Sequence, residues 1–164
     1  MALGPRDIVL GDILNSDADA IVFSAHPSLM AGSGVSGIIH KAAGRELQRA
    51  AKAVGPIKPG ESIATPGFNL NAKHVIHTVC PRCIHGSKEE RDLLTKAYSS
   101  AMTTAKDLDV RSVAFVAMGI GIYRWPVEVA ARIAVEQLSK AEISSVAVYV
   151  VDEAIKDAYL KVLA

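Results

Sequence analysis

Short apolar, β-branched runs alternate along the chain with longer segments in which apolar positions recur every three or four residues. The short runs are typical of buried strands, and the longer segments are typical of helices that turn one face toward a sheet. The predicted strands are residues 8–10, 20–24, 62–65, 74–79, 112–117 and 145–151. The predicted helices are residues 35–54, 88–106, the segment after Pro126 and the segment after Asp152. This alternation predicts an α/β layered fold.

Proline and strand order refine the prediction. Gly55-Pro56 ends the first predicted helix, and Pro126 suits a first helical turn, where an N–H is not needed. The strands at 62–65 and 74–79 follow one another with no helix between them. The sheet should therefore be mixed and not purely parallel.

The composition fits a single globular domain spanning residues 1–164. Half of the 164 residues are hydrophobic and 21% are charged, which supplies a core and excludes intrinsic disorder. The 18 Lys and Arg residues nearly balance the 17 Asp and Glu residues, giving a net charge of +1. This balance gives no general attraction to duplex DNA or to an acidic membrane, so neither is expected as a partner.

Other sequence features bear on the compartment. No apolar run approaches the ~20 residues that a membrane span requires. The N-terminal segment lacks the basic start and apolar run of a signal peptide. Two cysteines, Cys80 and Cys83, do not make a disulfide framework. Together these features predict a cytoplasmic protein.

Two glycine-bearing loops are the most informative feature. Each follows an apolar strand and leads into a helix, at Ala31-Gly32-Ser33-Gly34-Val35 and at Met118-Gly119-Ile120-Gly121-Ile122-Tyr123. Backbone without Cβ approaches a ligand closely, and N–H groups at a helix start carry partial positive charge. Either loop alone could simply be a tight turn, but the pair suits a diphosphate.

The first loop also satisfies the GxGxxG pattern of dinucleotide-binding folds, at residues 32–37. The preceding strand ends near Ala25, several residues too early for the tight turn of that motif. No acidic residue closes a second strand about 20 positions later, as that motif requires. A nicotinamide dinucleotide is therefore disfavoured, and no cofactor is expected.

Single side chains near these loops are candidates for binding or catalysis. Asp12 follows the first strand, where its carboxylate could accept from an exocyclic amine such as that of adenine, although Gly-Asp is also a common turn. His26 lies at the end of the second strand, where it could act as an acid or base or be an ordinary exposed loop residue. The cluster Tyr123-Arg124-Trp125 could cover a ligand or cap the next helix.

The segment from His77 to His85 has the residue types of a metal site, with Cys80 and Cys83 between two histidines. One short segment supplying all four ligands would have to fold tightly around the ion, and Pro81 stiffens it. We therefore expect no metal, and a buried, apolar role for Cys80.

These residues together resemble the macro domain family, whose members bind ADP-ribose, across nearly the whole chain. The resemblance runs through Gly11-Asp12-Ile13, Asp19-Ala20-Ile21-Val22, Gly32 to Gly44, His74 to Val79, Ser112 to Phe115, Gly119 to Tyr123 and Pro126. It implies a three-layer α/β/α sandwich with a mixed central sheet and a ligand cleft at the strand ends.

The resemblance also implies roles for individual residues. Asp12 would hold the adenine amine, and Ile13 would line the same pocket. The first loop would wrap the distal ribose and one phosphate through Gly32, Ser33, Gly34 and Val35. The second loop would wrap the diphosphate through Gly119, Ile120, Gly121, Ile122 and Tyr123. Val151 falls where many members contact adenine, which implies no aromatic stacking there.

Two stretches of the family pattern are altered in this chain. The family's Asn-Ala-Ala-Asn stretch reads Phe23-Ser24-Ala25-His26 here, so that His26 replaces the asparagine that orients the distal ribose. The acidic residue that hydrolases of the family carry after the first loop is Ser36. These changes favour a module that binds ADP-ribose or ADP-ribosylated protein without turnover.

The alternative is a hydrolase that removes ADP-ribose from proteins, or processes ADP-ribose 1″-phosphate or O-acetyl-ADP-ribose, with His26 as base or ribose anchor. Whether the protein is an enzyme stays open at this point. The altered residues could also fit the cleft to a different nucleotide. Single-stranded RNA or poly(ADP-ribose) is disfavoured by the balanced charge and the 5% aromatic content.

Overall fold

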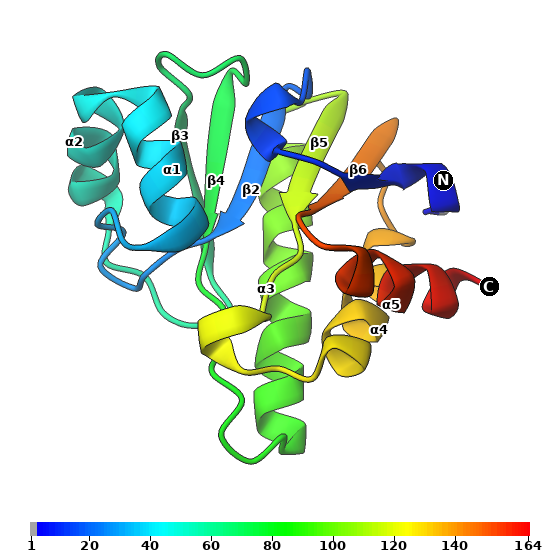
Figure 1. The fold of residues 1–164 in the computed structure, drawn as a ribbon. Helices are drawn as coiled ribbons and strands as arrows, with labels where there is room; N and C mark the ends of the chain where they lie inside the picture. The colour runs from blue at the N-terminus through cyan, green and yellow to red at the C-terminus, as the bar shows by residue number, and fades with distance from the viewer. Residues whose placement is uncertain (1–2) are drawn as a thin grey trace.

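The computed structural model describes residues 3–164, in which a six-stranded sheet lies between two layers of helices (Figure 1). The strands are β1 (Ile8–Leu10), β2 (Ala20–Ser24), β3 (Ser62–Pro66), β4 (His74–Thr78), β5 (Ser112–Val116) and β6 (Ser145–Val150). The helices are α1 (Gly34–Ala43), α2 (Arg45–Val54), α3 (Lys88–Asp107), α4 (Val127–Leu138) and α5 (Glu153–Leu163). Three short 3₁₀ helices are η1 (Pro5–Asp7), η2 (Ile13–Asn15) and η3 (Gly121–Tyr123). The predicted strands are confirmed to within one residue at each end.

The strand order is β1-β6-β5-β2-β4-β3. Every neighbouring pair is parallel except β3 and β4, which are antiparallel. The sheet is therefore mixed, as the missing helix between these two strands predicts. Because β1, β2, β4, β5 and β6 run the same way, their carboxyl ends lie at one edge of the sheet.

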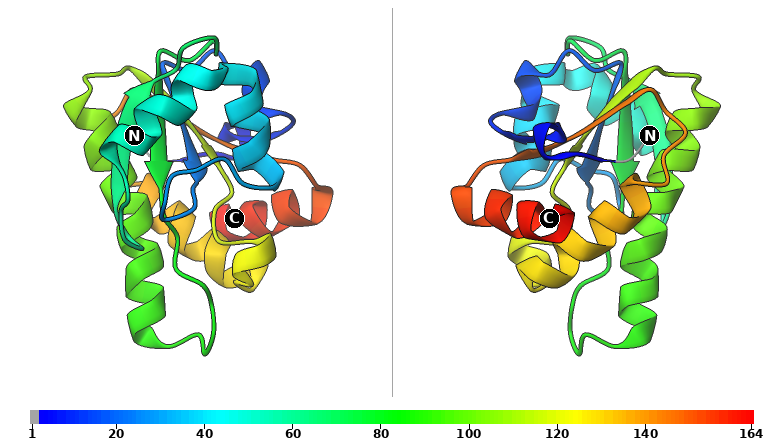
Figure 2. Two further views of the ribbon diagram at one scale, coloured as in Figure 1. Left: turned by 90° about the vertical axis from the view of Figure 1, so that its left-hand side faces the viewer. Right: turned by 90° about the vertical axis from the view of Figure 1, so that its right-hand side faces the viewer.

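The helices divide between the two faces of the sheet (Figure 1, Figure 2). On one face α1 packs on β2, where Phe23 contacts His40 with ring centroids 6.2 Å apart. On the other face α3 packs on β3 and β4, and Tyr98 stacks on Phe115 of β5 at 5.7 Å. Helices α4 and α5 continue this second layer through contacts from α3 to α4 and from α4 to α5. The α/β/α sandwich that the resemblance implies is confirmed.

The single helix predicted over residues 35–54 is wrong, because the structure contains two helices there. They meet at Gly44, whose φ of 92° lies in the left-handed region that favours glycine. The turn lets α1 pack on β2 while α2 packs on the edge strand β3. The three- and four-residue spacing of apolar residues continues through the break, so the sequence pattern predicted one helix.

The C-terminal half agrees with its sequence pattern. A capping box joins Ser87 and Glu90 at the start of α3, and Asp152 accepts from the Ile155 N–H at the start of α5.

None of the helices within residues 3–164 combines the length and apolarity needed to cross a bilayer.

A buried imidazole cluster lies between the sheet and α1. His77 is fully buried, and its ring lies 5.1 Å from Phe23 and 6.2 Å from His40. The Thr65 hydroxyl lies 3.0 Å from His77 Nε2 and donates to the Pro66 carbonyl, so Nε2 carries the proton and donates to Thr65. His77 Nδ1 has no hydrogen-bond partner. The ring is therefore held in its neutral form.

Stability should fall as the pH decreases below about 6.5, partly because of His77. Burial, helped by the nearby His40, lowers the pKa of His77 from 6.5 to about 4. Between these values the unfolded chain binds a proton at His77 and the folded protein does not, so acid favours unfolding. The shift corresponds to about 3 kcal/mol of unfolding free energy. Urea unfolding at pH 7.5 and pH 4.5 measures the loss.

His77→Gln isolates this contribution, because a glutamine amide can donate to Thr65 but does not titrate. The variant should lose less stability than the wild type between the two pH values, whatever its stability at pH 7.5. His85→Gln, at an exposed loop position, serves as the control and should behave as the wild type. An unchanged pH dependence in His77→Gln would show that His77 is not the responsible group.

Candidate functional site

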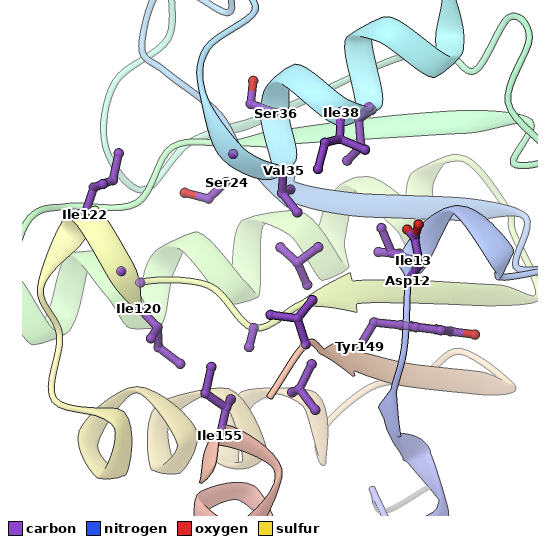
Figure 3. A pocket seen from close by; sticks show the side chains of 18 of the residues that line it. Asp12, Ile13, Ser24, Val35, Ser36, Ile38, Ile120, Ile122, Tyr149 and Ile155 are labelled. Atoms are coloured by element: carbon purple, nitrogen blue, oxygen red, sulfur yellow. The ribbon is translucent and has the colours of Figure 1, made fainter. Parts of the chain in front are cut away.

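A cavity of about 700 Å³ opens at the carboxyl ends of the parallel strands (Figure 3). Figure 3 shows it running from Asp12, Ile13 and Tyr149 at one end toward Ser36 and Ile122 at the other. Among the lining residues of the described chain, 3–164, Asp12 alone has a formal charge. The remainder of the wall is aliphatic side chains, glycine, serine and tyrosine, so an anion held here is held by backbone and hydroxyl groups.

At one end, the turn after β1 presents Asp12. The Asp12 Oδ1 atom accepts from the Leu14 N–H at 2.9 Å, which caps η2 and fixes the side chain. The second carboxylate oxygen has no donor among the described residues and remains available to a ligand. Ile13 is buried and lines the same end of the cavity.

The first glycine loop leads into α1 with its N–H groups uncapped. Ser33 is the N-cap residue but its side chain makes no capping hydrogen bond. Gly34 has a φ of 66°, and a Cβ there would meet nothing within 4 Å. At Gly37 a Cβ would lie 2.4 Å from the Gly32 carbonyl oxygen, so glycine is needed for the loop to fold back over the helix. The helix start is thereby left open to the cavity.

The second glycine loop follows β5. Gly119 and Gly121 have φ values of 89° and 86°, which turn the backbone away from the strand and into η3. A Cβ at Gly119 would lie 3.1 Å from the Trp125 ring. The loop is anchored at its start, where Met118 N donates to the buried Tyr98 hydroxyl at 2.9 Å.

The cluster that follows this loop fixes its position. Trp125 is buried and its indole N–H donates to the Pro81 carbonyl at 2.9 Å. The Tyr123 hydroxyl lines the cavity and donates to the Ala25 carbonyl at 3.3 Å, which ties the second loop to the end of β2. Burial raises the pKa of Tyr123, so the hydroxyl stays protonated. Trp125 thus anchors the chain, and Tyr123 joins the two loops.

Most of the predicted binding residues line this one cavity. They are Asp12, Ile13, Ser33, Gly34, Val35, Gly119, Ile120, Gly121, Ile122, Tyr123 and Val151. Gly32 is not among the lining residues and instead borders a second hollow on the other side of its loop. Val151 lies at the rim, where it is 77% exposed.

His26 is not among the residues that line the cavity. Its side chain is exposed, and Nδ1 lies 2.8 Å from the Ser28 hydroxyl and accepts from the Ser28 N–H at 3.1 Å. Ser36 does line the cavity, but its hydroxyl accepts from the Gly32 N–H at 3.3 Å. Ser36 therefore braces the first loop.

The sequence analysis missed several lining residues, among which Tyr149 matters most. It lines the same end of the cavity as Asp12 and Ile13 (Figure 3). Tyr149 lies in β6 only two residues before Val151, so the assignment of Val151 to the adenine end was the signal that could have found it. An aromatic group is therefore present at this end, where the resemblance implied none.

The histidines and cysteines between His77 and His85, which suggested a metal site, do not form a ligand cluster. Within residues 3–164, no three His, Cys, Asp or Glu side chains gather as metal ligands. Burial raises the pKa of Cys80 to about 12, so its thiol stays protonated. Cys80 is a buried apolar side chain, as its sequence context predicts.

The chain belongs to the macro domain family, whose Macro domain model matches residues 22–134. A macro domain-containing protein of Mesorhizobium japonicum is 42% identical, over 99% of this chain and 96% of that protein. An O-acetyl-ADP-ribose deacetylase of Cronobacter turicensis is 44% identical, over 83% of this chain and 80% of that protein.

Solved structures agree. The Oceanobacillus iheyensis macrodomain with ADP superimposes with a TM-score of 0.91 at 31% identity, covering 99% of this chain and 94% of that one. The Trypanosoma brucei macrodomain in complex with ADP-ribose gives 0.87 at 29% identity, covering 96% and 68%.

Tyr123→Phe should destabilise the fold by about 1 kcal/mol, the usual contribution of one hydrogen bond. The lost bond is the one to the Ala25 carbonyl. Chemical denaturation at pH 7.5 measures the difference. Tyr149→Phe is the matched control, because the Tyr149 hydroxyl has no partner among residues 3–164, and it should leave stability unchanged. Equal stability of the two variants would mean that the Tyr123 bond contributes nothing.

Proposed function

We propose that the cavity binds ADP-ribose, either free or attached to a protein. The observation that carries this proposal is the pair of glycine loops, which line one cavity that no cationic side chain of residues 3–164 lines. Backbone N–H groups at a helix start bind phosphate without help from lysine or arginine. Two such loops on opposite sides of the cavity match the two phosphates of a diphosphate.

The Asp12 end suits adenine. The free carboxylate oxygen of Asp12 can accept from the exocyclic amine, while Ile13 and Tyr149 provide apolar and aromatic contact for the ring. The distal ribose would then lie near Ser36 and Ile122. Related macrodomains solved with ADP and with ADP-ribose support this ligand.

Binding without turnover is favoured over hydrolysis. A hydrolase needs a base near the distal ribose, but the hydroxyl of Ser36 braces the loop and His26 lies outside the cavity. The 44% identity to an O-acetyl-ADP-ribose deacetylase supports the hydrolase alternative. That alternative would require the imidazole of His26 to turn into the cavity from its contact with Ser28.

The proposed partner is a small nucleotide, or a protein that carries one, in the cytoplasm. The balanced charge argues against duplex DNA and acidic membranes, and the scarcity of aromatic residues argues against single-stranded RNA or poly(ADP-ribose). No cofactor is needed for binding.

Asp12→Asn should weaken ADP-ribose binding about tenfold, because it replaces an acceptor by an amide that also donates. Asparagine can still cap η2 through its carbonyl oxygen, so the turn should be kept. Isothermal titration with ADP-ribose and with its inosine analogue, which lacks the exocyclic amine, separates the two effects. The wild type should prefer ADP-ribose, and Asp12→Asn should lose that preference.

Asp17→Asn removes an exposed carboxylate outside the cavity and should bind both ligands as the wild type does. Absence of any heat with ADP-ribose in the wild type would refute the proposed ligand. An unchanged preference in Asp12→Asn would refute the placement of adenine.

The wild type should release no more ADP-ribose from mono-ADP-ribosylated protein than Asp12→Asn does, and should not deacetylate O-acetyl-ADP-ribose. Release is measured by chromatography of the soluble nucleotide. Turnover that disappears in His26→Ala, with binding of ADP-ribose retained, would establish the hydrolase alternative instead.

A further inference from the structure

A second hollow, of about 500 Å³, lies outside the ADP-ribose cavity and is bordered by the end of α1 and the start of α2. The residues that border it are Ala31, Gly32, Gly37, His40, Lys41, Gly44, Arg45 and Gln48. It is a shallow surface depression, separate from the residues that line the main cavity.

The charges of the hollow favour an anion. Lys41 and Arg45 are exposed and form no ion pair among residues 3–164, and no acidic residue lines the hollow. The nearest carboxylate in sequence, Glu46, is paired with Arg49 at 3.2 Å. Both cations therefore remain available to a ligand.

The backbone of the hollow adds to these charges. Gly44, the N-cap residue of α2, has no side chain to cap the first N–H groups of that helix. An uncapped helix start thus borders the same depression as the two cations.

The hollow and the main cavity share one loop. Ala31 and Gly32 border the hollow, while the next residues, Ser33 and Gly34, line the cavity. Gln48 Oε1 accepts from the Ala31 N–H at 2.8 Å, which fixes the loop between the two depressions. The first glycine loop therefore borders both the hollow and the end of the cavity where the distal ribose is proposed to lie.

We propose that the hollow is a second anion site, which binds an acidic side chain next to the modified residue of an ADP-ribosylated protein. The inference rests on the proposed function of the main cavity. With this second site, the protein would prefer targets in which a carboxylate lies close in sequence to the ADP-ribosylated residue.

The test compares two synthetic mono-ADP-ribosylated peptides, one with glutamates flanking the modified residue and one with alanines, alongside free ADP-ribose. Wild type should bind the glutamate peptide about three- to tenfold more tightly than the alanine peptide, as expected for two solvent-accessible charge pairs. The preference should shrink in 0.5 M NaCl, because salt screens exposed charges. The backbone amide NMR signal of Arg45, which lines the hollow in the first turn of α2, should shift with the glutamate peptide more than with the alanine peptide.

Lys41→Gln/Arg45→Gln should remove the preference and leave the affinity for free ADP-ribose unchanged. The matched control is Arg132→Gln/Lys140→Gln, which removes two exposed cations from α4 and the turn after it, in the other helix layer. This control should keep the preference, because it lowers the net charge by the same amount as the test variant but leaves the residues of the hollow unchanged.

Three outcomes overturn the inference. Equal affinity of wild type for the two peptides, with ADP-ribose bound normally, would show that the hollow binds no carboxylate of the target. A preference that survives in Lys41→Gln/Arg45→Gln would place the anion site elsewhere. Failure of wild type to bind free ADP-ribose would overturn the proposed function itself, and the inference with it.

Discussion

Strands β2 and β5 lie side by side in the sheet, but the helices that follow them cover opposite faces. The chain leaving β2 turns toward α1, and the chain leaving β5 turns toward α4, so the two loops separate and leave a crevice between them. Ligands of open α/β sheets bind at such a point, outside the carboxyl ends of the strands. The position of the cavity, and the presence of one glycine loop on each side of it, follow from this single feature of the topology.

Backbone conformation, more than side-chain chemistry, defines the interior of the crevice. Glycines at positive φ shape two loops that line the same cavity, and the side chains around them act as supports: Ser36 braces the first loop and Tyr123 ties the second to the end of β2. Within residues 3–164, Asp12 is the one lining residue with a formal charge. The site is therefore polar along its backbone and apolar along most of its side chains, a combination suited to a nucleotide diphosphate.

The sequence predicted the strand boundaries, the mixed sheet and half of the residues that line the cavity, because strands and glycine loops are encoded locally. It failed where the outcome depends on three-dimensional packing. The break at Gly44 was missed because apolar spacing continues through a left-handed glycine. For His26 the sequence shows only a position after β2; its role stays a prediction, and in the structure the imidazole contacts Ser28 and is not among the cavity-lining residues. Tyr149 was missed because no local pattern distinguishes a strand residue that lines the cavity from its neighbours.

The proposed anchoring of a diphosphate by main-chain groups has an evolutionary consequence. Most substitutions change a side chain and leave the peptide N–H in place, so phosphate recognition tolerates sequence drift so long as the glycines remain. Of the positions that depart from the family resemblance, only Ser36 lines the cavity, at the end away from Asp12, whereas Phe23 is buried in the core and His26 is exposed. A lineage can in this way gain or lose chemistry at one end of the ligand without first losing the ligand.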